Sequence, residues 1–226
     1  TAAWHIAQAA LKLANLYVSW NKLPEAEAAY KRALTQMYQS FGQDNGWTAD
    51  ESYAVGHFYY QQQRYAEAEP LLMRAKNIYG ERLGKANRAP GKLSLELLTF
   101  MAASPNDSVS GYGTPDVYIK ALLDLAAIKA KDGKLDEAEE LYEELRSVNE
   151  WVRTELPSYD FMTTLEEKER EKETLKYAAL YAASLNSYSR LLVRRGKTAE
   201  ADALRVILAN VNEELENYEP PPPWQF

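Results

Sequence analysis

The sequence predicts an all-α fold, a right-handed superhelical solenoid of about four helical hairpins with inserted helix and loop segments. Two observations lead to this prediction. A stretch of seven residues occurs four times in similar form along the 226-residue chain, and each copy combines a turn with the start of a helix. Between the copies, the chain is rich in Ala, Leu, Glu, Lys and Gln and poor in Gly and Pro, which favours helix.

The repeated stretch covers residues 21–27, 63–69, 133–139 and 196–202. Each copy contains an alanine followed by an acidic residue, and the shared alanines are Ala26, Ala68, Ala138 and Ala201. An apolar helical pattern lies upstream of each copy and contains one small residue at the same register: Ala14, Gly56, Ala126 or Ser189. The hairpins are therefore expected near residues 7–40, 49–82, 119–152 and 182–215.

These residues resemble the tetratricopeptide repeat, in which small side chains let two antiparallel helices approach and larger ones fill the space between hairpins. Gly56 and Tyr59 match its pattern fully, whereas Lys129 and Arg205 stand where an aromatic residue is expected. Ala26 and Ala68 are 42 positions apart (68 − 26), a longer spacing similar to that of kinesin light chains. The resemblance implies the tetratricopeptide fold and a concave groove that holds a peptide.

Two longer intervals between the shared alanines predict insertions near residues 84–113 and 151–173. In the first, residues 93–101 are expected to form a short apolar helix that packs on the core or, as the alternative, covers the groove. The charged run at 165–173 is expected to extend the following repeat helix outward. The repeat domain spans residues 1–219 and ends at a Pro-rich tail, residues 220–226.

The composition argues against several classes of protein. A net charge of −7 disfavours a general nucleic-acid binder, because such proteins need a dominant basic face. No apolar run is long enough to predict a membrane span, although a start at Thr1 leaves room for an anchor that has been removed. The absence of cysteine excludes disulfides and thiolate zinc sites. The sequence leaves the compartment open and favours a soluble domain of the cytoplasm or of an organelle lumen.

The search for catalytic chemistry finds little in this sequence. The chain has two histidines, His5 and His57, and neither belongs to a histidine-pair zinc motif. The pair Gly91-Lys92 lacks the first glycine and the hydroxyl residue of a phosphate-binding loop. We therefore expect a protein that is not an enzyme, with no catalytic residue, no metal and no cofactor.

Candidate ligand-binding residues follow from the register of the repeats. In this type of solenoid the first helix of each hairpin lines the inner surface. The inner stripe then includes Gln8 and Leu11 in the first hairpin and Leu123 and Ala127 in the third. The residues expected to bind a peptide are Asn15, Tyr53, His57, Tyr60, Lys120, Lys131, Asn186, Arg190 and Arg194.

The side chains on this stripe indicate what it would bind. The amides and His57, with Gln61 beside them, would hydrogen-bond a peptide backbone, while the cations would favour acidic side chains or a terminal carboxylate. The leading hypothesis is a non-enzymatic adaptor with a protein or peptide client, an acidic segment being favoured. The alternative is a structural subunit of a larger assembly, membrane-associated assemblies included, that uses its convex face and insertions. An enzyme or a small-ligand sensor ranks third.

Overall fold

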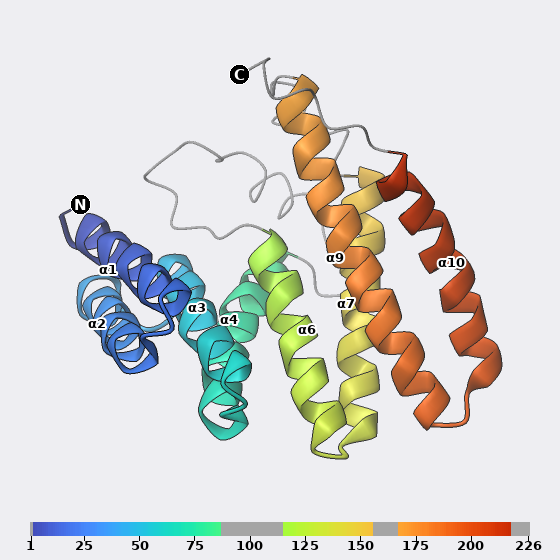
Figure 1. Cartoon of the computed structure of the whole chain (residues 1–226), viewed down its shortest axis with the longest axis horizontal. Helices are drawn as coiled ribbons and strands as arrows, with labels where there is room; N and C mark the ends of the chain where they lie inside the picture. Colours follow the sequence, from blue (N-terminus) through green and yellow to red (C-terminus); the bar gives the residue numbers. More distant parts are fainter. Residues whose placement is uncertain (1, 87–114, 156–166, 218–226) are drawn as a thin grey trace.

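The computed structural model describes residues 2–86, 115–155 and 167–217, and these residues form helices joined by short turns (Figure 1). The described part contains no strand, and the predicted all-α repeat fold is confirmed. The predicted helix at 93–101 and the Pro-rich tail lie outside the described residues. The helices are α1 (Ala2–Ser19), α2 (Leu23–Phe41), α3 (Gly46–Gln61), α4 (Tyr65–Ala86), α6 (Pro115–Lys131), α7 (Leu135–Glu155), α9 (Glu167–Arg194) and α10 (Thr198–Glu216).

The helices pair into four hairpins, α1/α2, α3/α4, α6/α7 and α9/α10, which follow one another from one end of the molecule to the other (Figure 1). The second helix of each hairpin packs on the first helix of the next, so α4 contacts α6 directly. The 28 residues between them therefore do not interrupt the stack (114 − 86). Because α9 begins at Glu167, the charged run extends this helix as expected.

The first residue of each repeated stretch has a positive φ angle. Asn21, Gln63, Gly133 and Gly196 have φ values of 56°, 58°, 80° and 76°, which place all four in the left-handed region. Glycine adopts this region at little cost, and a residue there ends one helix and redirects the chain into the next. The repeated stretch of sequence thus marks the tight turn of each hairpin.

The core consists of two clusters that meet at α6. Leu125 and Ile128 of α6 belong to a cluster with residues of α1 to α4, whereas Ile119 and Leu122 of the same helix belong to a cluster formed mainly with α7, α9 and α10. All four side chains are fully buried. One helix therefore contributes to both clusters and joins the two halves of the solenoid.

Ion pairs connect neighbouring hairpins at one recurring position, the acidic residue after each shared alanine. The Glu27 carboxylate lies 2.5 Å from the Arg64 guanidinium, and the Glu69 carboxylate lies 2.7 Å from the Lys129 ammonium. Glu139 pairs with Lys197 at 2.5 Å and with Arg195 at 2.8 Å. Each pair joins the second helix of one hairpin to the first helix or turn of the next.

Gly56 lies at the closest approach of α3 and α4, and its replacement tests the role of the small position. An added Cβ would lie 3.0 Å from Leu72 Cγ and 3.2 Å from Leu71 Cβ. We expect Gly56→Ala to destabilise the protein by about 1 kcal/mol, because this crowding outweighs the better helix propensity of alanine. Urea denaturation followed by circular dichroism measures the change.

Gly80 of α4 is the matched control, since the nearest atom to its added Cβ is Tyr118 Oη at 3.8 Å, an ordinary contact. Gly80→Ala should stabilise the protein by about 0.5–1 kcal/mol through helix propensity alone. If both variants gained stability, Gly56 would not be a point of close helix contact.

Candidate functional site

Three aromatic residues predicted to bind a ligand form a row along α3. The ring centroids of Tyr53 and His57 are 5.4 Å apart and those of His57 and Tyr60 are 6.1 Å apart, with the rings nearly parallel in both pairs. Tyr60 also contacts the ring of Tyr65 at the start of α4, at 5.9 Å. All four residues are half-buried. They offer ring surface to a ligand while their packing limits movement.

His57 is oriented by hydrogen bonds on both ring nitrogens. Its Nδ1 lies 2.6 Å from Asp124 Oδ2, and its Nε2 lies 2.9 Å from Gln61 Nε2. A carboxylate accepts hydrogen bonds and an amide nitrogen donates them, so these partners assign the proton to Nδ1 in the neutral ring. Asp124 belongs to α6 and is only 6% exposed. The imidazole is thus held by the following hairpin as well as by its own helix.

The hydroxyl of Tyr60 is a hydrogen-bond donor at neutral pH. Burial raises its pKa above the ordinary tyrosine value, and the nearby Asp124 carboxylate raises it further. A protonated phenol can donate to a carbonyl or carboxylate of a ligand.

Lys131, another predicted residue, completes this cluster from the end of α6. Its ammonium donates to Tyr65 Oη at 2.8 Å and lies 4.4 Å from the centre of the same ring. The side chain is exposed. We refer to the surface formed by these residues as the His57 surface; it comprises Tyr53, His57, Tyr60, Gln61, Tyr65, Asp124 and Lys131.

The other predicted residues lie outside the His57 surface. Asn15 is exposed on α1, but its side-chain oxygen accepts a hydrogen bond from the Tyr30 hydroxyl of α2, so part of its amide is used within the first hairpin. Lys120 is half-buried on α6 and already has an interaction partner. On α9, Asn186 and Arg190 are exposed.

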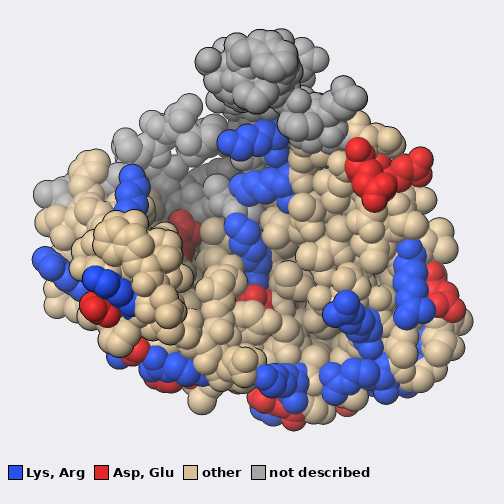
Figure 2. All heavy atoms as spheres, viewed as in Figure 1, with Lys and Arg blue, Asp and Glu red and all other residues tan. Residues whose placement is uncertain are grey.

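Arg194 connects α9 to the third hairpin. Its guanidinium donates to the backbone carbonyl of Ala130, at 3.1 Å, which brings this cation next to the end of α6 where Lys131 lies. On the face that Figure 2 shows, Lys and Arg side chains gather over α6 and α9 beside a hollow. Arg194 and Lys131 therefore lie near each other, although single pairs of exposed charges contribute little by themselves.

A buried carboxyl group lies beneath Gln8, a residue of the predicted inner stripe. Gln8 Nε2 donates to Glu51 Oε1 at 3.2 Å, and Glu51 is 1% exposed. Its second oxygen, Oε2, is buried without a hydrogen-bond partner. Burial, together with the charge of Asp50, raises the pKa of Glu51 to about 8. Glu51 is therefore mostly protonated in the folded protein at neutral pH.

Sequence reasoning missed two residues of the His57 surface. Asp124 lies within an apolar stretch of α6, residues 121–128, and a lone charge on a buried helix face is the signal that could have identified it. Tyr65 begins α4 directly after the hairpin turn. Tyr65 and Lys131 are 66 residues apart in the sequence, and no periodicity along the chain indicates that they are in contact.

The described residues contain no cluster of three or more His, Cys, Asp or Glu side chains suited to a metal ion. Among the helices of this part of the chain, none combines the length and the apolar character that crossing a membrane requires.

Comparisons with known proteins identify the type of fold. Residues 54–88, which include part of the His57 surface, match the family model of the tetratricopeptide repeat. The crystal structure of BtubC (BKLC) from P. vanneervenii is similar, with a TM-score of 0.61 at 12% sequence identity. The match covers 96% of this chain and 66% of that chain. No curated protein matches the sequence.

Proposed function

We propose that this chain, which has a tetratricopeptide-repeat match and the fold of such a protein, is a non-enzymatic adaptor that holds an acidic segment of another protein in its concave groove. Tetratricopeptide repeats generally mediate protein–protein interactions. The observation that carries the proposal is the His57 surface, where a row of aromatic rings and oriented polar groups adjoins the cations of α6 and α9.

The chemistry of the His57 surface suits an extended peptide. Gln61 uses one amide N–H toward His57, which leaves its carbonyl oxygen and its second N–H for a peptide backbone. The rings of Tyr53 and Tyr60 provide area for the aliphatic parts of side chains. Exposed charge pairs contribute about 0.2–1 kcal/mol each, so ring contacts and backbone hydrogen bonds must supply most of the affinity. The cations would select acidic residues and speed up encounter.

Charge reversal at the end of α9 tests this proposal. In the double variant Arg190→Glu/Arg194→Glu we expect the affinity for an acidic client peptide to fall by about tenfold or more, and its salt dependence to diminish. The client is identified by affinity capture with the intact chain, and a fluorescent peptide copying its bound segment is then titrated into each variant. Circular dichroism confirms unchanged helicity.

The control variant is Lys172→Glu, because Lys172 is exposed on the same helix. It lies 18 residues before Arg190 (190 − 172), about 27 Å along α9. This variant should bind the peptide like the parent. If the double variant and the parent had equal affinities, the cations of α9 would have no part in binding.

A structural role in a larger assembly is the second candidate function. The exposed side chains of Leu16 and Trp20 at the end of α1 favour it, because large apolar groups at one end of a solenoid are typical of a contact surface. The Arg190→Glu/Arg194→Glu variant distinguishes the two functions, because it would weaken client binding in the concave groove and leave such an assembly unchanged.

A further inference from the structure

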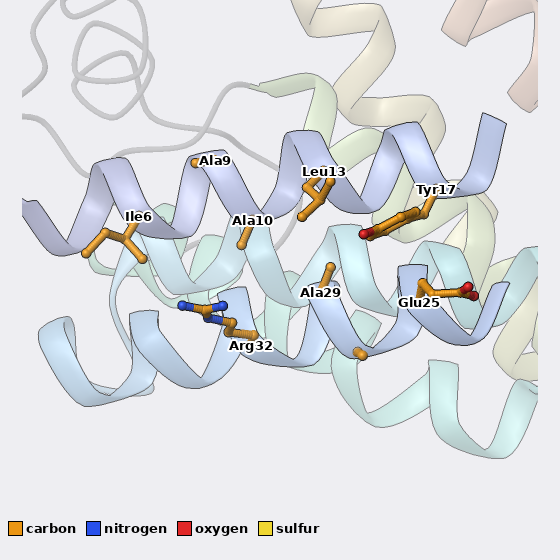
Figure 3. Close-up of a pocket in the computed structure, with 9 residues that line it drawn as sticks. Ile6, Ala9, Ala10, Leu13, Tyr17, Glu25, Ala29 and Arg32 are labelled. Atoms are coloured by element: carbon orange, nitrogen blue, oxygen red, sulfur yellow. The ribbon is translucent and has the colours of Figure 1, made fainter. Parts of the chain in front are cut away.

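An apolar groove lies between α1 and α2 at the end of the solenoid, and it has a volume of about 540 Å³. Ile6 and Leu13 on its α1 side are 48% and 43% exposed, which is high for side chains of this size. Figure 3 shows them on the side of α1 that faces α2, with Arg32 of α2 opposite. The apolar lining includes Ile6, Ala9, Ala10, Leu13, Tyr17 and Ala29, and Glu25 and Arg32 of α2 add one charge of each sign.

The positions equivalent to the α1 side of this groove are buried in every later hairpin. With Ala14, Gly56, Ala126 and Ser189 in register, Ile6 corresponds to Thr48, Tyr118 and Tyr181, and Leu13 corresponds to Val55, Leu125 and Tyr188. All six equivalent residues are at most 4% exposed. They are covered because the second helix of the preceding hairpin packs there: α2 on α3, α4 on α6 and α7 on α9. The groove of the first hairpin therefore has the form of a seat for one more second helix.

The charges at this seat indicate which helix would fit. At the next junction, Glu27 of α2 is held by the Arg64 guanidinium at 2.5 Å and by the Tyr59 hydroxyl at 3.2 Å. In the first hairpin, Tyr17 and Lys22 occupy the positions of Tyr59 and Arg64. Lys22 lies over the Trp20 ring at 5.7 Å, and no carboxylate of the described residues pairs with it. The first hairpin thus presents the two groups that hold a glutamate elsewhere in the molecule.

The opposite end of the solenoid does not complement this groove. The residues of α2 that correspond to the outer side of α10 are Tyr30, Leu34 and Met37, which are all buried. In α10 the same positions hold Arg205, Ala209 and Asn212, which are exposed. A polar outer face is typical of a terminal capping helix, so a second copy of this chain would not stack on the groove through α10.

We propose that the α1/α2 groove binds an amphipathic helix of a partner protein, which lies where the second helix of a preceding hairpin would lie. An acidic residue near the start of that helix meets Tyr17 and Lys22. Large apolar residues three, seven and ten positions later fill the groove, as Tyr30, Leu34 and Met37 do after Glu27. This surface is separate from the His57 surface, and its occupation would lengthen the solenoid by one helix.

A helical peptide that copies Leu23–Phe41 provides the probe, because α2 is the second helix of a hairpin of this chain. The peptide is stapled to hold the helix, labelled with a fluorophore and titrated into the intact chain by fluorescence anisotropy. We expect saturable binding that Leu13→Glu weakens by about tenfold or more. Lys22→Glu should weaken it by about fivefold, and a peptide with Glu27→Lys should recover most of this loss.

Two controls separate this binding from other effects. Val206 is 65% exposed on α10, so Val206→Glu introduces a similar change at the other end and should leave the affinity unchanged. The Arg190→Glu/Arg194→Glu variant should also bind the probe normally. This result would distinguish binding at the α1/α2 groove from peptide binding in the concave groove. Because Leu13 is already half-exposed, circular dichroism should show the Leu13→Glu variant folded.

The absence of saturable binding, or equal affinities of the parent and Leu13→Glu, would overturn the proposal. Sedimentation velocity tests the competing occupant. A parent dimer that Leu13→Glu converts to a monomer would show that a second copy of the chain covers the groove, and this too would overturn the assignment to a partner helix.

Discussion

Glu51→Gln is expected to make the protein more stable than the parent at pH 8 and to lose this advantage at pH 5. Glu51 is 1% exposed in α3, and burial raises its pKa from 4.5 to about 8. In the unfolded chain the same carboxyl titrates near 4.5. The folded state therefore binds one more proton than the unfolded state between these two values. Its stability is highest below pH 4.5 and falls as the pH rises toward 8.

The size of this effect follows from the pKa difference. One pKa unit corresponds to about 1.4 kcal/mol, so this linkage removes about 3 kcal/mol of stability at pH 7 and about 4 kcal/mol at pH 8. Glutamine keeps the shape of the side chain and an oxygen for the Gln8 amide, and it does not titrate. Its NH2 group takes the place of the unpartnered Oε2 and costs about 1–3 kcal/mol at every pH. The change with pH is therefore the diagnostic result.

Thermal unfolding of both proteins at pH 5, 6, 7 and 8 measures this change. The melting temperature of the variant relative to the parent should rise steadily over the series. Glu140→Gln on the exposed side of α7 is the matched control and should show no such trend. Parallel pH profiles for Glu51→Gln and the parent would mean that Glu51 is ionised in the folded protein.

Glu139→Gln should destabilise the protein by about 2–3 kcal/mol, because one carboxylate at the junction of the last two hairpins serves two cations. The Glu139 side chain is 9% exposed; Lys197 donates to its Oε1 at 2.5 Å, and Arg195 forms an ion pair with Oε2 at 2.8 Å. Glutamine retains an acceptor oxygen, but it removes the charge that Lys197 pairs with and leaves Arg195 with Asp136, at 2.6 Å, as its remaining acidic partner. The loss is larger than for a surface pair because the carboxylate is shielded from water.

Asp202 provides a matched comparison, since it follows the shared alanine of the last hairpin as Glu139 does in the third. Its carboxylate is 67% exposed, and within the described part of the chain it pairs only with Arg205 of the same helix. Asp202→Asn should therefore change the stability by less than about 0.5 kcal/mol. Urea denaturation at neutral pH gives both values, and similar midpoints for the two variants would show that the junction pair contributes no more than a surface pair.

The repeat fold was predictable because its determinants are local. A left-handed residue at the turn, a small residue at the helix contact and an apolar period of 3.6 recur in every hairpin, and each acts on neighbouring residues. Tyr53, His57 and Tyr60 were predictable for the same reason, since spacings of three and four residues place side chains on one face of a helix. Their role in binding a peptide stays a prediction.

Contacts between hairpins could not be predicted in the same way. Lys129 seemed a departure from the repeat pattern, yet its ammonium lies 2.7 Å from Glu69 and 2.6 Å from Glu137, where an aromatic ring would leave both carboxylates unpaired. Asn15 is predicted to bind a peptide, and its side-chain oxygen accepts a hydrogen bond from the Tyr30 hydroxyl. In both cases the partner lies on another helix.

The sequence by itself determined the number of hairpins, their turns and the face of α3 that carries the aromatic row. Only the tertiary structure decided that Asp124 holds His57, that Glu51 is buried beneath Gln8, and that Ile6 and Leu13 stay exposed while their equivalents are covered. The physical reason is that helix register depends on residues three or four apart, whereas burial and charge pairing depend on which second helix packs against each first helix. At α1 no second helix of the described residues takes that place.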